Sequence, residues 1–337
     1  MSEKVRVLLT RRFLPEDIEY IKARLYPNVE LVTPETFETE GFADALQSGV
    51  DALLGEPPGK EVLDKAKGLR LIQVPWTGVE RLDRVLLRKY SFTVCNSHSN
   101  ARVVAEHAWA LLLSAAKWIP YHDRLLRQGK WCRPNLGEPG QFRASESLYG
   151  RTLGIIGYGA VGGILASLAG GFGLDIQAVD ARSLPETPSS LSRLVGPPDL
   201  GVVAAAADFL VVTVPLVDET LGMIDRKVFD CMKATAYLVS VSRGEVIVEE
   251  DLYRALSEHR IAGAAIDTWY QYPRPDSPDV LPSRRFPFHE LDNLVLSPHR
   301  AGFARGELPH LDDAIENLNR FAAGKELINI VDLSAGY

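Results

Sequence analysis

Three ionisable residues follow apolar, strand-like runs in the second half of the chain, namely Arg243, Asp267 and His299. A guanidinium offers a rigid fork of N–H donors that matches a carboxylate. An imidazole exchanges protons near neutral pH. Together these residues predict a site that binds a small carboxylic acid and moves a proton. Taken singly, each has a plainer interpretation: a surface arginine at a strand end, a hydrogen-bonded structural histidine, and a helix cap or loop acid.

A glycine-rich loop, GYGAVG, matches the GxGxxG pattern. The pattern alone is weak in a chain with 27 glycines, but here it follows a predicted strand and opens a predicted helix. The first glycine permits a tight turn, the second lets the backbone approach a pyrophosphate, and the third lets the helix pack on the strand. Free N–H groups at the helix start favour phosphates. The sequence therefore predicts a dinucleotide site at Gly157, Tyr158, Gly159, Ala160, Val161 and Gly162.

An acidic residue, Asp180, ends the next predicted strand. A carboxylate there accepts hydrogen bonds from the adenosine ribose hydroxyls and repels a 2′-phosphate, so NAD is favoured over NADP. Arg182, two residues on, could soften that preference. The competing interpretation is a glycine-rich turn beside a solvated aspartate. We expect Val214, Pro215 and Ser242, which lie at or just after the ends of the following strands, to line the same cofactor site.

The elements that must position these residues alternate between short apolar runs and helical patterns, which is typical of βαβ units around parallel sheets. In the second half we predict strands at 152–156, 175–180, 209–214, 236–242, 261–266 and 294–297, and helices near 161–172, 248–258 and 310–323. Most of these strands are continuous apolar runs, as expected for strands covered on both faces. The Pro- and Ser-rich stretches 183–200 and 270–290 give no clear pattern.

The first hundred residues read as a smaller α/β unit. We predict strands at 5–9, 29–32, 52–54, 70–74 and 92–95, with a helix over 15–25. Residues 102–118 form a helix that is apolar nearly all round, so it joins two domains or packs against a second subunit. Residues 119–150, rich in Gly and Pro, are predicted to form an extended arm or long loop.

Composition excludes several classes of protein. The chain has 337 residues, 46% hydrophobic and 24% charged, enough for about two soluble domains. Its net charge of −7 argues against nucleic acid as the main partner. The start of the chain does not resemble a signal peptide, and no apolar run is long enough for a membrane span. The cysteines, Cys95, Cys132 and Cys231, form no CxxC pair, so we expect reduced cytoplasmic thiols and no metal site.

Eight segments in order resemble the D-isomer-specific 2-hydroxyacid dehydrogenase family, and the match runs through nearly the whole chain. They are LRLIQVPWTGVERLD, VCNSHSNARVVAEHAWALLLSAAK, GRTLGIIGYGAVG, VTVPLVDETLGMI, VSVSRGEVIVEEDLYRAL, GAAIDTW, LVLSPHRAG and NLNRFAAGKELINIV. The resemblance is to enzymes of the phosphoglycerate dehydrogenase and glyoxylate/hydroxypyruvate reductase type. It implies a Rossmann domain at 102–300, inserted in a flavodoxin-like substrate domain at 1–101 plus 301–337.

The resemblance also implies roles for individual residues. Arg243 would bind the substrate carboxylate, His299 would be the general acid/base, and Asp267 would lie near the nicotinamide. Pro215 would lie over the cofactor, and Asn100 would form part of a hinge. The family is usually homodimeric through its second domain. The substrate pocket would be lined by Trp76, Thr77 and Gly78, whose backbone N–H would bind the carboxylate, and also by His98, which lies in a loop after a predicted strand.

One departure from the family pattern concerns the histidine. Where relatives carry a glutamate five residues after the aspartate, this chain has Tyr272. A carboxylate would stabilise protonated histidine and raise its pKa, whereas a neutral tyrosine can only hydrogen-bond. We therefore hypothesise that His299 titrates lower than in relatives with the glutamate. Ser240, where relatives often have Asn, is expected to matter less.

Two further functions stay open from the sequence. A non-enzymatic NAD(H)-sensing protein of the same fold would tolerate loss of the glutamate, although intact Arg243 and His299 argue against it. A dehydrogenase of formate or phosphite is the other, because formate dehydrogenases of this superfamily carry Gln near that position and Gln271 is adjacent. The remaining histidines have no comparable placement after strands; they are His107, His122, His259, His289 and His310.

Overall fold

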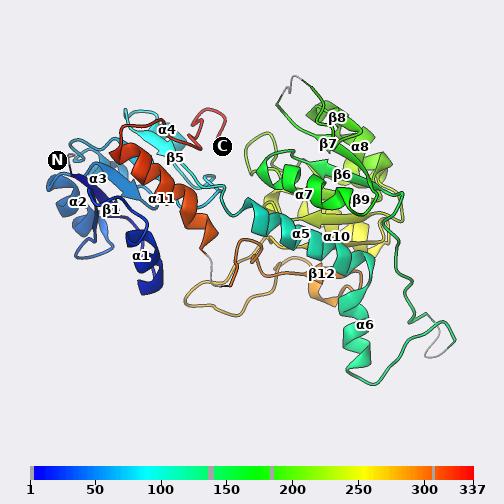
Figure 1. Ribbon diagram of the computed structural model, residues 1–337. Helices are drawn as coiled ribbons and strands as arrows, with labels where there is room; N and C mark the ends of the chain where they lie inside the picture. Colours follow the sequence, from blue (N-terminus) through cyan, green and yellow to red (C-terminus); the bar gives the residue numbers. More distant parts are fainter. Residues whose placement is uncertain (1–3, 136–139, 183–185, 306–307) are drawn as a thin grey trace. The chain divides into compact units, whose positions relative to one another are not determined.

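The computed structural model describes residues 4–135, 140–182, 186–305 and 308–337. The chain divides into two compact units, one made of Met1–Asn100 with Phe303–Tyr337 and the other of Ala101–Gly302 (Figure 1). Each unit has its own sheet, and the described residues contain no helix long and apolar enough to cross a membrane. Parts of the predicted stretches 119–150 and 183–200, namely residues 136–139 and 183–185, lie outside the described residues.

The first unit is built on a five-stranded sheet in the order β2-β1-β3-β4-β5, with every neighbouring pair parallel. This is the flavodoxin-like strand order. The strands are β1 (Val5–Leu9), β2 (Val29–Val32), β3 (Ala52–Leu54), β4 (Leu71–Gln73) and β5 (Thr93–Cys95). The helices are α1 (Pro15–Lys22), α2 (Thr39–Gln47), α3 (Lys60–Leu63), α4 (Arg84–Leu87) and α11 (Pro309–Ala322).

Alternation along the strands gives this sheet two apolar faces. In β1, Val7 and Leu9 face one core with Ile21 of α1 and Leu311 of α11, whereas Leu8 faces the other core with helices α2 and α3. Successive strand side chains point to opposite faces, so a strand covered on both sides must be apolar throughout. The run VRVLL fits this rule except at Arg6, whose guanidinium donates to the carbonyls of Ser48 and Gly49.

A buried polar cluster ties the C-terminal segment to the first unit. The Asn317 side chain, fully buried on α11, donates to Gln73 Oε1 and to the Ile328 carbonyl, each at 2.8 Å. Its own carbonyl oxygen accepts the Ile328 N–H at 2.8 Å. The Gln73 amide donates in turn to the carbonyls of Val74 and Asn96. Because the groups satisfy one another, the cluster carries little of the usual penalty for burying polar atoms.

The second unit is built on a seven-stranded parallel sheet in the order β12-β11-β10-β9-β6-β7-β8. The strands are β6 (Thr152–Ile156), β7 (Asp175–Val179), β8 (Arg193–Val195), β9 (Phe209–Val212), β10 (Tyr237–Ser240), β11 (Gly263–Ile266) and β12 (Leu294–Leu296). The helices are α5 (Ala101–Ala116), α6 (Ile119–Leu126), α7 (Ala160–Gly170), α8 (Leu200–Ala206), α9 (Arg226–Cys231) and α10 (Glu249–Ser257), with single 3₁₀ turns at Pro197–Asp199, Gly244–Val246 and Phe288–Glu290.

Two cores cover the faces of this larger sheet. Leu210 and Val212 of β9 face a core with helices α8, α9 and α10, whereas Phe209 and Val211 face a core with α5 and α7. The apolar helix predicted at 102–118 is α5, and it is buried within its own unit against α7 and the sheet. That packing accounts for its apolar sequence without a partner chain.

Short elements are where the sequence prediction fails. The predicted strands begin and end within about two residues of the observed bounds, but β8 was not predicted at all. The predicted arm is wrong over its first residues, where α6 begins with Pro120 in its first turn, a position that proline favours in helices. The helix predicted over 15–25 ends at Lys22. Five further helices were not predicted: α2, α3, α4, α8 and α9.

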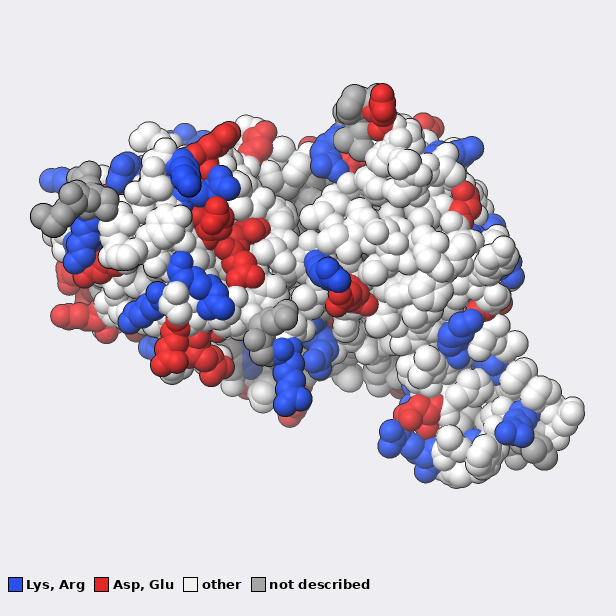
Figure 2. All heavy atoms as spheres, viewed as in Figure 1, with Lys and Arg blue, Asp and Glu red and all other residues white. Residues whose placement is uncertain are grey.

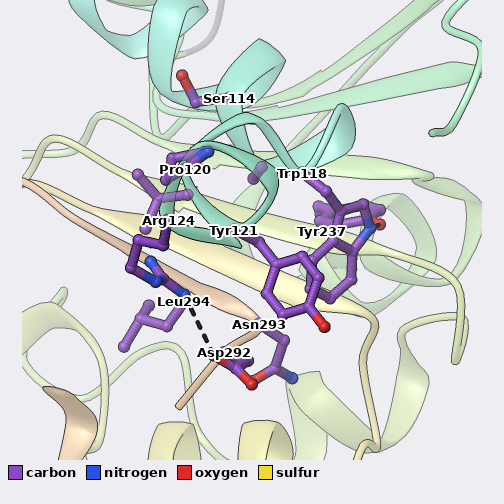
Figure 3. Close-up of a pocket in the computed structure, with 11 residues that line it drawn as sticks. Ser114, Trp118, Pro120, Tyr121, Arg124, Tyr237, Asp292, Asn293 and Leu294 are labelled. Carbon is purple, nitrogen blue, oxygen red and sulfur yellow. Dashed lines mark hydrogen bonds and ion pairs between the residues drawn. The ribbon is translucent and has the colours of Figure 1, made fainter. Parts of the chain in front are cut away.

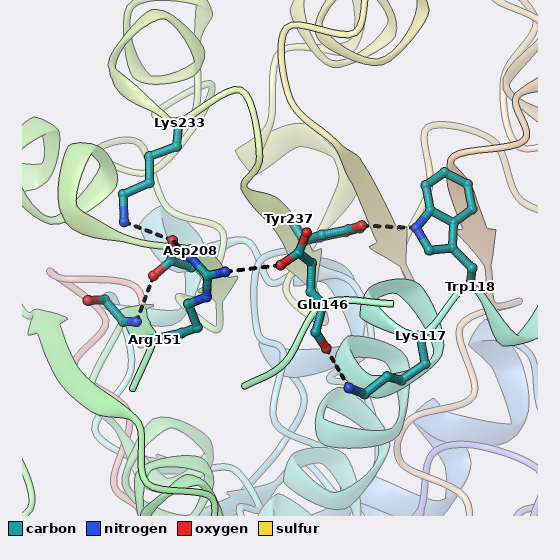
Figure 4. A network of polar contacts seen from close by, with 8 residues as sticks. Lys117, Trp118, Glu146, Arg151, Asp208, Lys233 and Tyr237 are labelled. Atoms are coloured by element: carbon teal, nitrogen blue, oxygen red, sulfur yellow. Dashed lines mark hydrogen bonds and ion pairs between the residues drawn. The ribbon is translucent and has the colours of Figure 1, made fainter. Parts of the chain in front are cut away.

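The amino-terminal edge of the larger sheet is held by a polar network (Figure 4). Asp208 accepts the Thr152 backbone N–H at 2.9 Å and the Lys233 ammonium at 2.8 Å. Arg151 lies between two carboxylates: its Nη1 is 3.8 Å from Asp208 Oδ1, and its Nη2 is 3.3 Å from Glu146 Oε2. The charges of the network are structural and lie at the edge opposite the loops that carry the candidate site.

On the face drawn in Figure 2, Lys and Arg side chains are interspersed with Asp and Glu.

Candidate active site

The carboxyl ends of the parallel strands in the second unit are in register. Their paired end residues, from β12 to β7, are Leu296, Ile266, Ser240, Val212, Ile156 and Val179. The loops that follow therefore emerge along one edge in the order His299, Asp267, Arg243, Pro215, Gly157 and Asp180. Neighbouring strands lie about 4.8 Å apart, so Asp180 and Asp267 are separated by about 19 Å along this edge. These loops, from His299 to Asp180, form a row that is long enough for a dinucleotide laid across the sheet.

The glycine-rich turn lies where the strand order reverses. From β8 the chain crosses back to β9, which lies on the other side of β6. Gly157 follows β6 and therefore emerges at this reversal. Gly157 has φ +98°, and a Cβ there would lie 2.9 Å from Val214 Cγ1. At Gly162 a Cβ would lie 2.2 Å from the Gly157 carbonyl oxygen, which enforces close packing of α7. At Gly159, the residue before α7, a Cβ would meet nothing within 4 Å.

Asp180 and Arg182 are paired beside this turn. The Asp180 carboxylate accepts the Tyr158 N–H at 2.8 Å and both the backbone N–H and the Nε–H of Arg182, at 2.8 and 2.9 Å. The Arg182 guanidinium also donates to the Tyr158 carbonyl at 2.7 Å. Burial acts to raise the pKa of Asp180, but these hydrogen bonds together hold it below its usual value. The group is therefore a fixed anion at neutral pH.

The middle of the row is formed by the ends of β9 and β10. The Ser242 hydroxyl donates to the Val214 carbonyl, which joins the two loops. Arg243 donates from Nη1 to the Ser242 carbonyl at 2.9 Å and is followed by the 3₁₀ turn Gly244–Val246. The geometry places Val214, Pro215, Ser242 and Arg243 at one edge, as the sequence predicted from their position after strands.

Asp267 organises the loop that carries His299. Its fully buried carboxylate accepts the Ser297 hydroxyl, the Arg300 N–H at 3.0 Å and the Ala301 N–H at 3.1 Å. Its backbone carbonyl accepts the His299 N–H at 2.7 Å. Asp267 is thus neither a helix cap nor a solvated loop acid.

His299 itself has φ 51°, in the left-handed region that few non-glycine residues adopt. The hydrogen bonds to Asp267 hold the turn in this conformation. The imidazole therefore lies on a solvent-exposed turn, and the buried Asp267 fixes the backbone of that turn.

His107 is a residue that the sequence reasoning passed over. Its Nε2 lies 2.9 Å from Ser297 Oγ and 3.5 Å from Asp267 Oδ1. The signal for it was a histidine within the apolar run of α5, where a polar side chain requires a partner. Spacing could not identify that partner, because Asp267 and Ser297 lie far away in the sequence.

Tyr272 lies against His299, with ring centroids 5.3 Å apart and planes at 55°. Its hydroxyl oxygen accepts the Trp269 N–H at 3.1 Å. Burial raises the pKa of Tyr272, against the opposite effects of that hydrogen bond and of the Arg243 guanidinium. The phenol is neutral at physiological pH, so the position that the family fills with a carboxylate supplies no negative charge to the imidazole.

The predicted substrate residues of the first unit lie at the carboxyl edge of its own sheet. The loop after β4 is tied to the loop after β5: the Thr77 hydroxyl donates to the Ser97 carbonyl at 2.8 Å, and Asn96 Nδ2 donates to the Thr77 carbonyl at 2.8 Å. The Arg11 guanidinium lies 4.9 Å from the Trp76 ring centroid. Within the unit, Trp76, Thr77, Gly78 and His98 are therefore brought to neighbouring loops.

His98 is held in this cluster by the C-terminal helix. Its backbone N–H donates to Asp313 Oδ2 at 2.7 Å. Burial lowers the pKa of His98, with Asp313 acting in the opposite direction.

A pocket elsewhere in the second unit does not belong to this row. It lies between α5, α6 and the start of β10 and β12 and is lined by Trp118, Tyr121, Arg124, Tyr237 and Asp292 (Figure 3). The Arg124–Asp292 ion pair, at 3.1 Å, closes one side. Because Tyr237 and Leu294 begin their strands, the pocket is at the amino-terminal edge, away from the loops that carry the candidate chemistry.

The residues of the row fit a dinucleotide. The open space at Gly159, the amino-terminal turn of the eleven-residue helix α7 and the Asp180 anion are the three features that such a ligand requires. The residues that would hold the pyrophosphate are the loop 157–162, and Asp180 would hold the adenosine ribose.

Known proteins are similar to this chain in sequence. The family model described as D-isomer specific 2-hydroxyacid dehydrogenase, NAD binding domain, matches residues 109–301. A glyoxylate reductase of Korarchaeum cryptofilum is 34% identical over 291 residues, 86% of this chain and 82% of that protein. A glyoxylate reductase of Thermococcus onnurineus is 29% identical over 333 residues, 96% of this chain and 94% of that protein.

Solved structures agree with the architecture. A D-isomer specific 2-hydroxyacid dehydrogenase from Xanthobacter autotrophicus, in complex with NADPH and MES, matches with a TM-score of 0.76 at 21% identity and covers 100% of both chains. The predicted fold class, two α/β domains with one Rossmann sheet, is confirmed. The chain belongs to the D-isomer specific 2-hydroxyacid dehydrogenase family, an oxidoreductase class.

Proposed function

We propose that this protein interconverts a small 2-oxo acid and its 2-hydroxy acid with NAD(H), and that Arg243 binds the carboxylate while His299 moves the proton. The observation that carries the proposal is the in-register edge of the larger sheet, where His299, Asp267, Arg243 and the glycine-rich turn emerge in that order.

The chemistry divides between the cofactor and the chain. NAD(H) held by the loop 157–162 and Asp180 would supply the hydride chemistry at C2 of the acid. Arg243 pairs with the carboxylate of the acid and polarises its oxo group. The protonated imidazole of His299 donates to the oxo oxygen during reduction and accepts the hydroxyl proton during oxidation. Tyr272 supports the imidazole by ring contact at 5.3 Å without adding charge.

The proposed preference for NAD over NADP rests on Asp180. Its anion lies beside the glycine-rich turn, where a 2′-phosphate would be repelled. Arg182 does not present a free cation to such a phosphate, because its guanidinium is bound to the Asp180 carboxylate and to the Tyr158 carbonyl. Relatives of the same fold have been solved with NADPH, so the preference needs a direct test in this chain.

In this proposal one unit binds the substrate and the other binds the cofactor. We assign residues 1–101 plus 301–337 to substrate binding and 102–300 to the cofactor, with Asn100 in the hinge between them. In the first, Gly78 would offer its N–H to the carboxylate, and Trp76, Thr77 and His98 would line the pocket.

A homodimer in the cytoplasm is the assembly that we propose. Several aromatic and aliphatic side chains of α6 and the segment after it are exposed, among them Trp131 at 65% and Ile119 at 54%. In Figure 1 this segment projects from the sheet of its own unit. An apolar projection of this kind suits burial against a second copy of the chain.

The test is a panel of acids run with NADH and NADPH side by side. Glyoxylate, the substrate in the names of the relatives, comes first, followed by hydroxypyruvate, pyruvate and phenylpyruvate, with formate and phosphite tested for NAD reduction. Oxidation of NADH by a 2-oxo acid supports the proposal. Tight NADH binding with no turnover of any acid would indicate a sensor, and NAD reduction by formate or phosphite alone would indicate the other class of dehydrogenase.

A further inference from the structure

The environment of Asp267 defines the direction of a hydrogen-bonded chain that reaches α5. An ionised carboxylate accepts hydrogen bonds and cannot donate them. The Ser297 hydroxyl must therefore donate its proton to Asp267 Oδ1. The Ser297 oxygen is then left as an acceptor toward His107, whose Nε2 is 2.9 Å away. It follows that His107 carries a proton on Nε2, and the chain runs from His107 to Ser297 to Asp267.

The same carboxylate holds the turn that displays His299. Both oxygens of Asp267 accept backbone N–H groups of that turn, from Arg300 and Ala301. The turn is also tied at its start, where the Ser297 carbonyl accepts the Trp269 indole N–H at 2.9 Å. A group that orients the Ser297 hydroxyl and the Asp267 carboxylate therefore acts on the position of His299.

We propose that His107 is a positioning residue for the reaction, and that it acts through Ser297 and Asp267 to hold the left-handed turn that presents His299. The inference rests on the proposed function, because it assigns His299 the proton transfer. His107 does not contact the acid in this scheme. Its side chain is 25% exposed and its Nε2 is directed to the serine.

Loss of this donor would leave a buried hydroxyl and carboxylate less well oriented. The Ser297 hydroxyl connects the hydrogen bond of His107 to the charged Asp267 carboxylate. Removing this hydrogen bond therefore affects the turn more than removing a hydrogen bond between two neutral groups would. A turn with φ 51° at a histidine relaxes when its anchors weaken. General acid catalysis depends on the position of the proton donor, so the effect falls on kcat.

The experiment compares His107→Leu with the matched variant His107→Gln. Leucine fills the same space without a donor, whereas the glutamine amide nitrogen stands where Nε2 stands and can donate to Ser297. We expect the leucine variant to lose roughly tenfold or more in kcat with KM for the oxo acid within about twofold. The glutamine variant should recover most of the loss. Equal kcat in the leucine variant and wild type, or a glutamine variant as slow as the leucine variant, overturns the inference.

Backbone amide hydrogen exchange tests the same inference without turnover. The Arg300 and Ala301 amides should exchange about tenfold faster in the leucine variant and at the wild-type rate in the glutamine variant. Equal exchange in all three proteins overturns the inference. Faster exchange that extends to β6 also overturns it, because His107 would then be a general core residue. A wild-type protein that turns over no 2-oxo acid contradicts the proposed function alone, since the exchange measurement still decides the role of His107.

Discussion

Replacing Tyr272 by glutamate should move the pH range in which this protein reduces its substrate. Reduction needs the imidazolium form of His299, so activity is full below the pKa of that group and falls as pH rises through it. A neutral phenol supplies no negative charge to the imidazolium, whereas a carboxylate raises the pKa of the histidine. Tyr272→Glu should therefore extend activity to higher pH than in wild type.

The size of the effect follows from the distance between the two rings. Their centroids are 5.3 Å apart, and His299 is exposed, so the interaction is screened. With an effective dielectric constant of about 40, a unit charge at this distance stabilises the imidazolium by about 1.6 kcal/mol. That corresponds to about one pH unit in the midpoint of the basic limb.

The assay is the dependence of kcat/KM on pH for the best 2-oxo acid of the panel, with NADH saturating. Tyr272→Gln is the control, because glutamine has the shape of glutamate without the charge, and its midpoint should equal that of wild type. Identical midpoints for the Glu and Gln variants would refute the reasoning, as they would show that this position does not set the charge state of His299.

Four other changes test the site and the fold. His299→Asn keeps a residue that tolerates the left-handed turn, so NADH affinity should stay near wild type while kcat falls by about 10²–10⁴ through loss of the general acid; unchanged turnover would remove His299 from the mechanism. Arg243→Lys should raise KM and lower kcat together, because an ammonium cannot form the bidentate pair, and a change in KM alone would mean that Arg243 only binds the ground state. Asp180→Ala should raise kcat/KM for NADPH relative to kcat/KM for NADH by about tenfold or more, because the repulsion of a 2′-phosphate is lost. An unaltered ratio would show that other residues set the cofactor preference. Asn317→Leu should lower the free energy of unfolding by about 2–4 kcal/mol in urea, because buried partners lose their hydrogen bonds, and a loss below about 1 kcal/mol would show that the polar cluster is dispensable.

Local patterns in the sequence were enough to predict the framework. Short, mainly apolar runs identified every strand of the described residues except β8, because a parallel strand covered on both faces is apolar along most of its length. The glycine-rich loop, Asp180, Arg243, Asp267 and His299 were found for a related reason. Each begins within three residues of the end of a strand, and parallel strands bring their carboxyl ends to one edge whatever lies between them.

The elements that were missed are those whose local signal is weak. The three-residue strand β8 lies at the sheet edge within a Pro- and Ser-rich stretch, and α9 has only six residues. Helices this short are not stable by propensity alone and form because they pack against a sheet. The same is true of α6, where the prolines and glycines nearby suggested an arm.

Contacts between distant residues were beyond the reach of any local pattern. Periodicity cannot show that His107 meets Ser297, that Arg182 folds onto Asp180 instead of pointing outward, or that the Tyr272 ring lies against the His299 ring. These pairings depend on how helices and loops are stacked over the sheet, because hydrogen bonds and ion pairs form between side chains that folding brings within about 3 Å. The chemistry of each residue type could thus be read from the chain, whereas its partner, and with it the protonation and orientation of the group, follows from packing.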